Sequence, residues 1–179
     1  MEYSKKINME GAIFFSTKYG STEQYAKWIG EASGLPVFEV HKTEVDLSKY
    51  DFLVLGSPII YYKPIIHKWI KRNIESIEKK QIIFFSVSGA SAGPKLDRWI
   101  ANSLPKSFVS KMRHVALQGR QIPSELRLFD RIMLKIAGYT NKDPVAKKQE
   151  LQGFDFMNIS SIEPILQLIQ EFQGTKVHT

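Results

Sequence analysis

The sequence predicts an α/β fold in which a doubly wound parallel sheet carries helices on both faces. Short apolar runs alternate with longer segments of helical periodicity along the chain. The runs at 51–56 and 81–87 are apolar enough to be strands buried on both faces of a sheet. The first apolar run leads through a loop of small hydroxylated residues into a helical segment, as expected of a right-handed βα unit.

Ten elements are expected in chain order. Gly34 and Pro36 end the first helix, Ser57-Pro58 is expected to break the third strand, and Gly138 is a stop signal for the fourth helix. The predicted strands are 12–15, 37–40, 51–56, 81–87 and 113–118, and the predicted helices are 23–32, 65–77, 95–103, 126–137 and 161–172.

Length and composition indicate one globular domain over residues 1–179, with its core at about 11–172 and a longer basic segment at 119–148. No run approaches the roughly 20 apolar residues of a membrane span, and no secretory hydrophobic region precedes the first strand. We therefore expect a cytoplasmic protein. The chain has no cysteine, so redox chemistry would have to come from a bound cofactor.

The net charge of +7 is concentrated in one part of the chain. Between Lys106 and Lys148 there are ten basic and three acidic residues, whereas the basic and acidic residues of the remainder cancel. This asymmetry predicts a local surface for an anionic partner.

The loop after the first strand is predicted to bind an anion. The N–H groups of the loop and of the first helical turn have no intrahelical partners, and the helix dipole favours negative charge there. Gly20 allows close approach of the backbone. Hydroxyls without a Gly-Lys-Ser/Thr ending suit a terminal monoester phosphate better than a nucleoside triphosphate. Four hydroxyls can donate to the anion, on Ser16, Thr17, Ser21 and Thr22.

The same stretch resembles the phosphate-loop signature of the flavodoxin family. The matching positions are Ile13, Phe14, Phe15, Thr17, Gly20, Thr22, Ala26 and Ile29. An ordinary βα loop with a Ser or Thr cap is the alternative. The resemblance implies flavin mononucleotide (FMN) as cofactor and a five-stranded parallel sheet in the order 2-1-3-4-5.

Flavodoxin-like proteins hold FMN with three loops at the carboxyl ends of the strands, where ligands of such sheets bind. The resemblance implies that the loop after the third strand lines one side of the flavin ring and the loop after the fourth strand lies on the other side. The implied cofactor-binding residues are Ser16, Thr17, Lys18, Tyr19, Gly20, Ser21, Thr22, Ser57, Pro58, Ile59, Ile60, Tyr61, Ser86, Val87, Ser88 and Gly89.

Aromatic side chains are present in the second of these loops and absent from the third. Tyr61 or Tyr62 would stack on the flavin; alternatively, one of them only covers the helix at 65–77. Electron-carrying flavodoxins usually supply aromatics from both loops. We therefore expect one face of the flavin to be open to a substrate.

Residues 126–137 are predicted to form an amphipathic helix with Arg127, Arg131 and Lys135 on one side. Leu126, Phe129, Ile132, Met133 and Ile136 are on the other side. Such a helix can lie on an anionic membrane surface. The alternative is a domain helix that packs through its apolar face and leaves its charges in water.

A narrower resemblance is to the menaquinone-dependent protoporphyrinogen oxidase branch of flavodoxin-like proteins. It rests on Asp130 to Lys135 and on Ser16 to Thr22, where that branch also carries a basic residue at the Lys18 position. It implies oxidation of a carboxylate-bearing porphyrinogen with a membrane quinone as acceptor. The loop Gln118–Pro123 departs from the pattern because it lacks the aromatic and basic density expected of this branch.

Other site types have little support in the sequence. The four histidines lack short metal-ligand spacing, Ser86 and Ser88 lack the Gly-x-Ser-x-Gly elbow of hydrolases, and no nucleic-acid-binding motif is present. We expect no metal site and no nucleic-acid partner.

Three functional hypotheses follow. The first is an FMN-dependent oxidoreductase in which Arg120 or Lys95 supplies positive charge near the N1/C2 edge of the flavin; no general acid or base is identified. The second is a flavodoxin-type electron carrier without its own substrate, although such carriers are usually acidic and this chain has a pI of about 9.5. The third is a flavin-free interaction domain.

Overall fold

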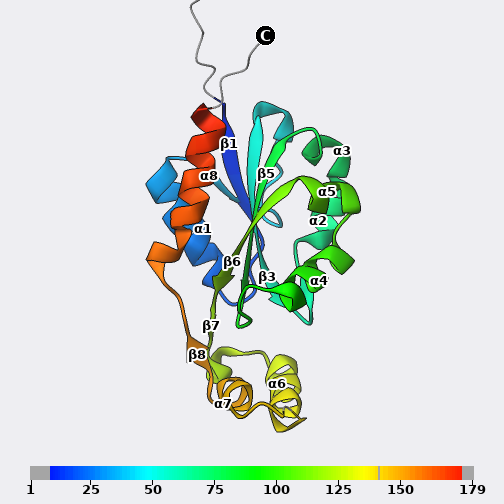
Figure 1. Cartoon of the computed structure of the whole chain (residues 1–179), viewed down its shortest axis with the longest axis vertical. Helices are drawn as coiled ribbons and strands as arrows, with labels where there is room; N and C mark the ends of the chain where they lie inside the picture. The colour runs from blue at the N-terminus through cyan, green and yellow to red at the C-terminus, as the bar shows by residue number, and fades with distance from the viewer. Residues whose placement is uncertain (1–8, 141, 175–179) are drawn as a thin grey trace, which may run out of the picture.

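The structure is a computed structural model that describes residues 9–140 and 142–174. Five parallel strands form the sheet in the order β2-β1-β3-β5-β6, and helices cover both faces (Figure 1). The predicted fold class and strand order are therefore confirmed.

The strands are β1 Gly11–Phe15, β2 Val37–Glu39, β3 Phe52–Ile60, β4 Lys63–Pro64, β5 Gln81–Ser88, β6 Met112–Gln118, β7 Arg120–Gln121 and β8 Phe154–Asp155. The α-helices are α1 Ser21–Ser33, α2 His67–Arg72, α3 Ile74–Ile77, α4 Pro94–Ser103, α5 Lys106–Lys111, α6 Leu128–Thr140, α7 Pro144–Gln152 and α8 Glu163–Gly174, and short 3₁₀ turns lie at Leu47–Lys49, Pro123–Glu125 and Ile159–Ile162.

Two hydrophobic cores form because successive side chains of the strands point to opposite faces of the sheet. The core beneath α1 and α8 includes Ile13, Phe15, Tyr25, Ile29, Val54, Phe85, Ile165 and Ile169. The core beneath α2, α4 and α5 includes Phe14, Leu55, Ile70, Phe84, Ile100 and Phe108. Burial on both faces accounts for the continuous apolar runs of β3 and β5.

An extension follows β6 and lies beyond the carboxyl ends of the strands (Figure 1). It contains β7, α6, α7 and β8; β7 and β8 pair antiparallel, and α6 packs against α7. The chain then returns to α8. The sequence did not predict β4, β7, β8, α5 or α7, which are short elements.

Three predicted boundaries were wrong. β3 continues through Ser57-Pro58 to Ile60, because Pro58 pairs with Val87 of β5 in the parallel register. The predicted helix 65–77 is divided at Asn73, whose side-chain amide donates to the carbonyl oxygen of Trp69 at 2.9 Å. α6 continues past Gly138, which is buried within it, because packing on α7 sustains the helix.

In the described part of the chain, every helix is too short or too polar to cross a membrane.

Candidate functional site: a phosphate loop and its neighbours

The loop after β1 has the geometry of an anion site. Gly20, the residue before α1, has a left-handed backbone (φ 85°) and provides no side-chain cap, so the first-turn N–H groups receive no capping side chain. The buried Tyr25 secures this end of α1, since its hydroxyl donates to the carbonyl oxygen of Gln118 at 2.8 Å. The positive end of the helix dipole therefore faces the loop.

The structure gives the four loop hydroxyls different partners. Ser16 Oγ is buried, 3.4 Å from Nε2 of His41. Thr17 Oγ1 accepts the Gly20 N–H at 3.0 Å. Ser21 Oγ accepts the Arg120 N–H at 3.2 Å, which connects the loop to β7.

Thr22 is the hydroxyl that remains for a ligand. Its side chain is buried, and among the described residues its Oγ1 has no hydrogen-bond partner. A buried hydroxyl without a partner costs free energy, which an acceptor oxygen of a bound phosphate would recover. The residues present thus fit the phosphate end of FMN.

The second loop is a tight β-hairpin between β3 and β4, with Tyr61 and Tyr62 as its two turn residues. Both have positive φ, 50° and 64°, a conformation that is uncommon for residues other than glycine and costs about 1–3 kcal/mol each. The Tyr62 ring lies 4.9 Å from the ring of Trp99 in α4. Tyr61 instead faces α6, where its ring contacts Phe129 at 6.4 Å. These two ring contacts are with α6 and α4, and not with α2, the helix that a tyrosine was expected to cover.

Ser57, Pro58, Ile59 and Ile60 lead into this hairpin as the last residues of β3. Ser57 is buried; its hydroxyl donates to the carbonyl oxygen of Pro58 at 3.0 Å and accepts the Ile66 N–H at 3.3 Å. This residue therefore holds the backbone of the hairpin, and the two tyrosines are the exposed part.

The third loop begins at the end of β5. Val87 is buried in the core, whereas Ser88 Oγ folds the loop by accepting the Ala90 N–H at 3.2 Å. Gly89 lies against the ring of Phe154 in β8: a Cβ at Gly89 would be 2.6 Å from Phe154 Cζ. The Phe154 ring stacks on that of Phe156 at 4.9 Å. Aromatic rings do lie beside this loop, although the loop itself supplies none.

Ser86 faces the core and not the loops. Its buried Oγ lies 2.8 Å from Nε2 of His114, whose Nδ1 lies 3.6 Å from the Asp97 carboxylate. Burial lowers the pKa of His114, and nearby Asp97 only partly opposes this effect. The series Ser-His-Asp has the order of a hydrolase triad, but a fully buried serine has no access to substrate.

The two expected cations lie apart. Lys95 Nζ lies over the ring of Trp99, 5.3 Å from its centroid, and thus next to the hairpin. Arg120 lies beside Ser21 and lines a cavity of about 450 Å³ on the outer side of the phosphate loop. Arg120 is therefore near the phosphate end of the site.

Asp130 of α6 also belongs to this site, and the sequence did not assign it a role. Lys18 and Tyr19 from the first loop and Tyr61 from the second all contact its carboxylate. In the sequence, Asp130 looks like an ordinary charge on the solvent side of an amphipathic helix, and for this reason it was given no role. Phe154 could have been assigned to a strand from the alternation of apolar and acidic residues in Phe154-Asp155-Phe156.

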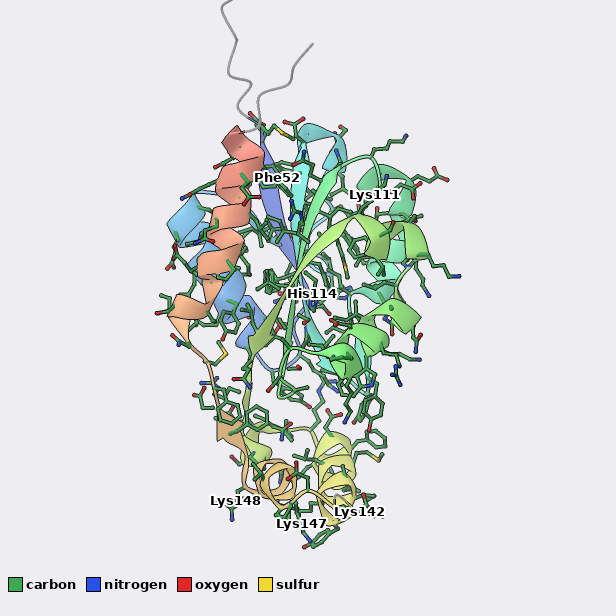
Figure 2. The ribbon with its side chains drawn as sticks, in the orientation of Figure 1. Phe52, Lys111, His114, Lys142, Lys147 and Lys148 are labelled. Atoms are coloured by element: carbon green, nitrogen blue, oxygen red, sulfur yellow. The ribbon has the colours of Figure 1, made fainter. Side chains whose placement is uncertain are left out.

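The basic residues between Lys106 and Lys148 do not all lie on one surface. Figure 2 shows Lys111 near α5 at one end of the molecule and Lys142, Lys147 and Lys148 at the tip of the extension. Within the described residues, no cluster of three or more His, Cys, Asp and Glu side chains is arranged to hold a metal ion.

α6 exposes the side of the helix that was expected to pack. Phe129, Ile132 and Ile136 are 66%, 48% and 51% exposed. Arg131 folds back onto the turn before the helix and donates to the carbonyl oxygens of Pro123 (3.0 Å) and Ser124 (2.8 Å). Of the apolar side expected for residues 126–137, Leu126 is buried, so the alternative of a helix packed through this face is wrong only for Phe129, Ile132, Met133 and Ile136.

The fold and the loop geometry together define an α/β protein with a flavodoxin-like phosphate loop. The family model described as "Flavodoxin domain" matches residues 12–146, and the chain belongs to this family. Flavodoxin 1 of Escherichia coli K12 is 43% identical over 54 residues, which are 28% of this chain and 31% of that flavodoxin. The chain thus matches about a third of the length of this curated relative. Family membership supports FMN as the cofactor.

Two solved structures are similar at low identity. A putative flavoprotein from Bacteroides eggerthii has a TM-score of 0.48 at 15% identity and covers 62% of this chain and 88% of its own. A flavoprotein from Lactobacillus acidophilus, solved in complex with FMN, has a TM-score of 0.46 at 12% identity and covers 62% and 92%.

Proposed function

We propose that this chain is an FMN-dependent oxidoreductase that takes electrons from a reduced organic substrate and passes them to a quinone or another acceptor. The observation that carries this proposal is the phosphate loop. An uncapped helix terminus and the buried, unpartnered Thr22 hydroxyl meet there, next to the hairpin after β3. A flavin-free interaction domain would not need a phosphate-binding loop of this kind.

The chain's own residues bind and orient the cofactor. Loop and first-turn N–H groups, with Thr22, hold the phosphate. The Tyr61 hairpin and the Ser88–Gly89 loop would flank the ring, and the extension lies beyond the same ends of the strands. FMN, when bound, supplies the electron-transfer chemistry, which the side chains of this cysteine-free chain do not provide.

A carboxylate-bearing porphyrinogen as substrate and a menaquinone-type acceptor are the finer proposal. The support is the sequence pattern from Asp130 to Lys135 and the exposed basic side chains of Arg127 and Lys135 on the extension. Cations near the flavin site attract a polycarboxylate. The electron carrier remains the competing function, and the basic charge of the chain counts against it.

The test has a binding arm and a turnover arm. FMN should bind the apoprotein more tightly than riboflavin, which lacks the phosphate, by at least about tenfold. Loaded protein should then oxidise protoporphyrinogen with a menaquinone analogue and not in a control without quinone. Equal affinity for FMN and riboflavin would contradict the phosphate site. FMN binding without turnover would favour the carrier.

We also propose that the exposed face of α6 contacts an anionic membrane surface, where a quinone acceptor would be dissolved. Its apolar residues are exposed, Arg127 and Lys135 of the same segment are exposed as well, and the lysines at the tip add positive charge. Apolar area together with basic residues is what binds anionic bilayers. The extent of this face sets it apart from single exposed apolar residues.

Vesicle flotation tests the contact. The chain should float with vesicles that contain phosphatidylglycerol and less with neutral ones, and the variant Ile132→Glu should lose most of the binding. The matched control is Ile159→Glu, because Ile159 is similarly exposed (55%) but lies outside α6. Equal losses in both variants would remove the assignment to α6.

A further inference from the structure

One carboxylate in the extension is bound by both of the first two flavin loops. Asp130 lies on the first turns of α6, and Lys18 Nζ contacts its two oxygens at 2.7 and 2.9 Å. The hydroxyl of Tyr19, from the same loop as Lys18, donates to one carboxylate oxygen, and that of Tyr61 donates to the other. Residues 69 to 112 positions apart in sequence thus meet at Asp130.

This cluster differs from an ordinary surface ion pair. The side chain of Asp130 is only 11% exposed and that of Lys18 only 23%. Lys18 Nζ also lies 5.5 Å from the centroid of the Tyr19 ring and 5.7 Å from that of Tyr61, so both rings enclose the cation. Both carboxylate oxygens accept hydrogen bonds, so the carboxylate has the partners that a group shielded from water needs.

The ionised form of Asp130 is favoured here. Partial burial would raise the pKa of Asp130, but the hydrogen bonds from Lys18, Tyr19 and Tyr61 outweigh it and lower the pKa to about 2. Conversely, burial and then Asp130 raise the pKa of Tyr61 to about 12, so its hydroxyl keeps the proton that it donates. The arrangement is therefore constant across neutral pH.

Tyr61 is a residue that needs such support. Its backbone is in the left-handed region, where bulky residues persist only when surrounding contacts hold them. Tyr62, next to it, faces Trp99, whereas Tyr61 extends toward the phosphate loop. Of the two turn residues, Tyr61 is therefore the one that spans the first and second flavin loops.

We propose that Asp130 is a positioning residue of the flavin site, which holds the Tyr61 ring beside the bound flavin and fastens α6 to the phosphate loop. The proposal rests on the proposed function, because it assumes that FMN occupies these loops. It deepens that function by assigning to the extension a role in cofactor geometry.

Aromatic contact alters flavin spectra, so the test uses spectra as well as affinity. Asp130→Asn and Tyr61→Phe should each raise the dissociation constant for FMN by about threefold to tenfold, the range expected for loss of one hydrogen bond. Both should change the visible circular dichroism and the fluorescence quenching of bound FMN in the same direction. In the double variant, Tyr61→Phe should add little to the effect of Asp130→Asn, because the contact of Tyr61 with the carboxylate is already broken there.

The matched control is Glu125→Gln, which removes one negative charge from the same exposed extension. It should leave the flavin spectrum and the affinity unchanged. Unchanged spectra in Asp130→Asn, with FMN bound and thermal unfolding cooperative, would overturn the proposal. Additive effects in the double variant would do the same. A wild-type chain that binds no FMN would instead remove the proposed function.

Discussion

The ring of Phe154 occupies the space that a side chain at Gly89 would need, since a Cβ at Gly89 would lie 2.6 Å from Phe154 Cζ. This contact joins the third flavin loop to β8 of the extension. Position 89 therefore accommodates glycine and no larger residue, because the Phe154 ring fills the space that a side chain there would need.

The substitution Gly89→Ala should therefore destabilise the protein by about 1–3 kcal/mol, the usual cost of overpacking. In a Phe154→Ala background the same change should cost much less, and urea unfolding of the four proteins measures the coupling. Gly174→Ala is the control, because nothing lies within 4 Å of a Cβ there. An equal cost of Gly89→Ala in both backgrounds would contradict the contact.

Thr22→Val should affect binding and stability differently. Valine has nearly the shape of threonine and removes a buried hydroxyl without a partner, so the apoprotein should be as stable as wild type or slightly more stable. FMN affinity should fall by about tenfold or more if Thr22 donates to the phosphate. Titration of the apoprotein with FMN and urea unfolding provide the two measurements.

The matched variant is Thr17→Val. Thr17 Oγ1 accepts the Gly20 N–H within the loop, so its removal should cost the apoprotein about 0.5–1.5 kcal/mol, the usual net contribution of one hydrogen bond. Wild-type FMN affinity in Thr22→Val would exclude this hydroxyl from the phosphate site.

Tyr62→Gly should change stability by less than about 1 kcal/mol although it deletes a large ring. Glycine relieves a left-handed backbone worth about 1–2 kcal/mol, and the lost contact with Trp99 costs about 0.5–1.5 kcal/mol. Trp99→Leu loses the same ring contact without that relief and should be the less stable variant in thermal unfolding. FMN affinity should stay within about twofold of wild type in Tyr62→Gly, because Tyr61 is the ring-side residue. A loss of flavin binding as large as in Tyr61→Phe would reverse that assignment.

His114 should make stability depend on pH near neutrality. Burial lowers the pKa of His114 in the folded state below its value of about 6.5 in the unfolded chain. The unfolded state then binds more protons, so the contribution is fully present above pH 6.5 and is lost as the pH falls toward the folded pKa.

Urea unfolding between pH 5 and 8 measures this effect. The wild type should lose at most about 1.4 kcal/mol per pH unit through His114, and His114→Gln should have a flatter profile. Asp97→Asn should steepen the loss, because the Asp97 carboxylate raises the pKa of His114. Identical profiles for wild type and His114→Gln would refute the assignment.

Much of the fold was predictable because its signals are local. Apolar runs such as 51–56 and 81–87 are set by burial on both sheet faces, and the strand order that the phosphate-loop resemblance implied is the order observed. The boundary errors at Pro58 and Gly138 share one cause, since in both a tertiary contact overrode the usual local meaning of proline or glycine. At Asn73 the error was the opposite, because a local side-chain contact divided a helix that the periodicity had extended.

The sequence by itself determined the α/β class, the family and the loop from Ser16 to Thr22, because a phosphate loop is a local pattern of hydroxylated residues and glycine between a strand and a helix. The tertiary structure decided what surrounds that loop. It brought Asp130 to Lys18 and Tyr61, placed Phe154 against Gly89, and turned the apolar face of α6 outward. Each of these depends on contacts between distant chain positions, for which hydrophobic periodicity and residue spacing carry no signal.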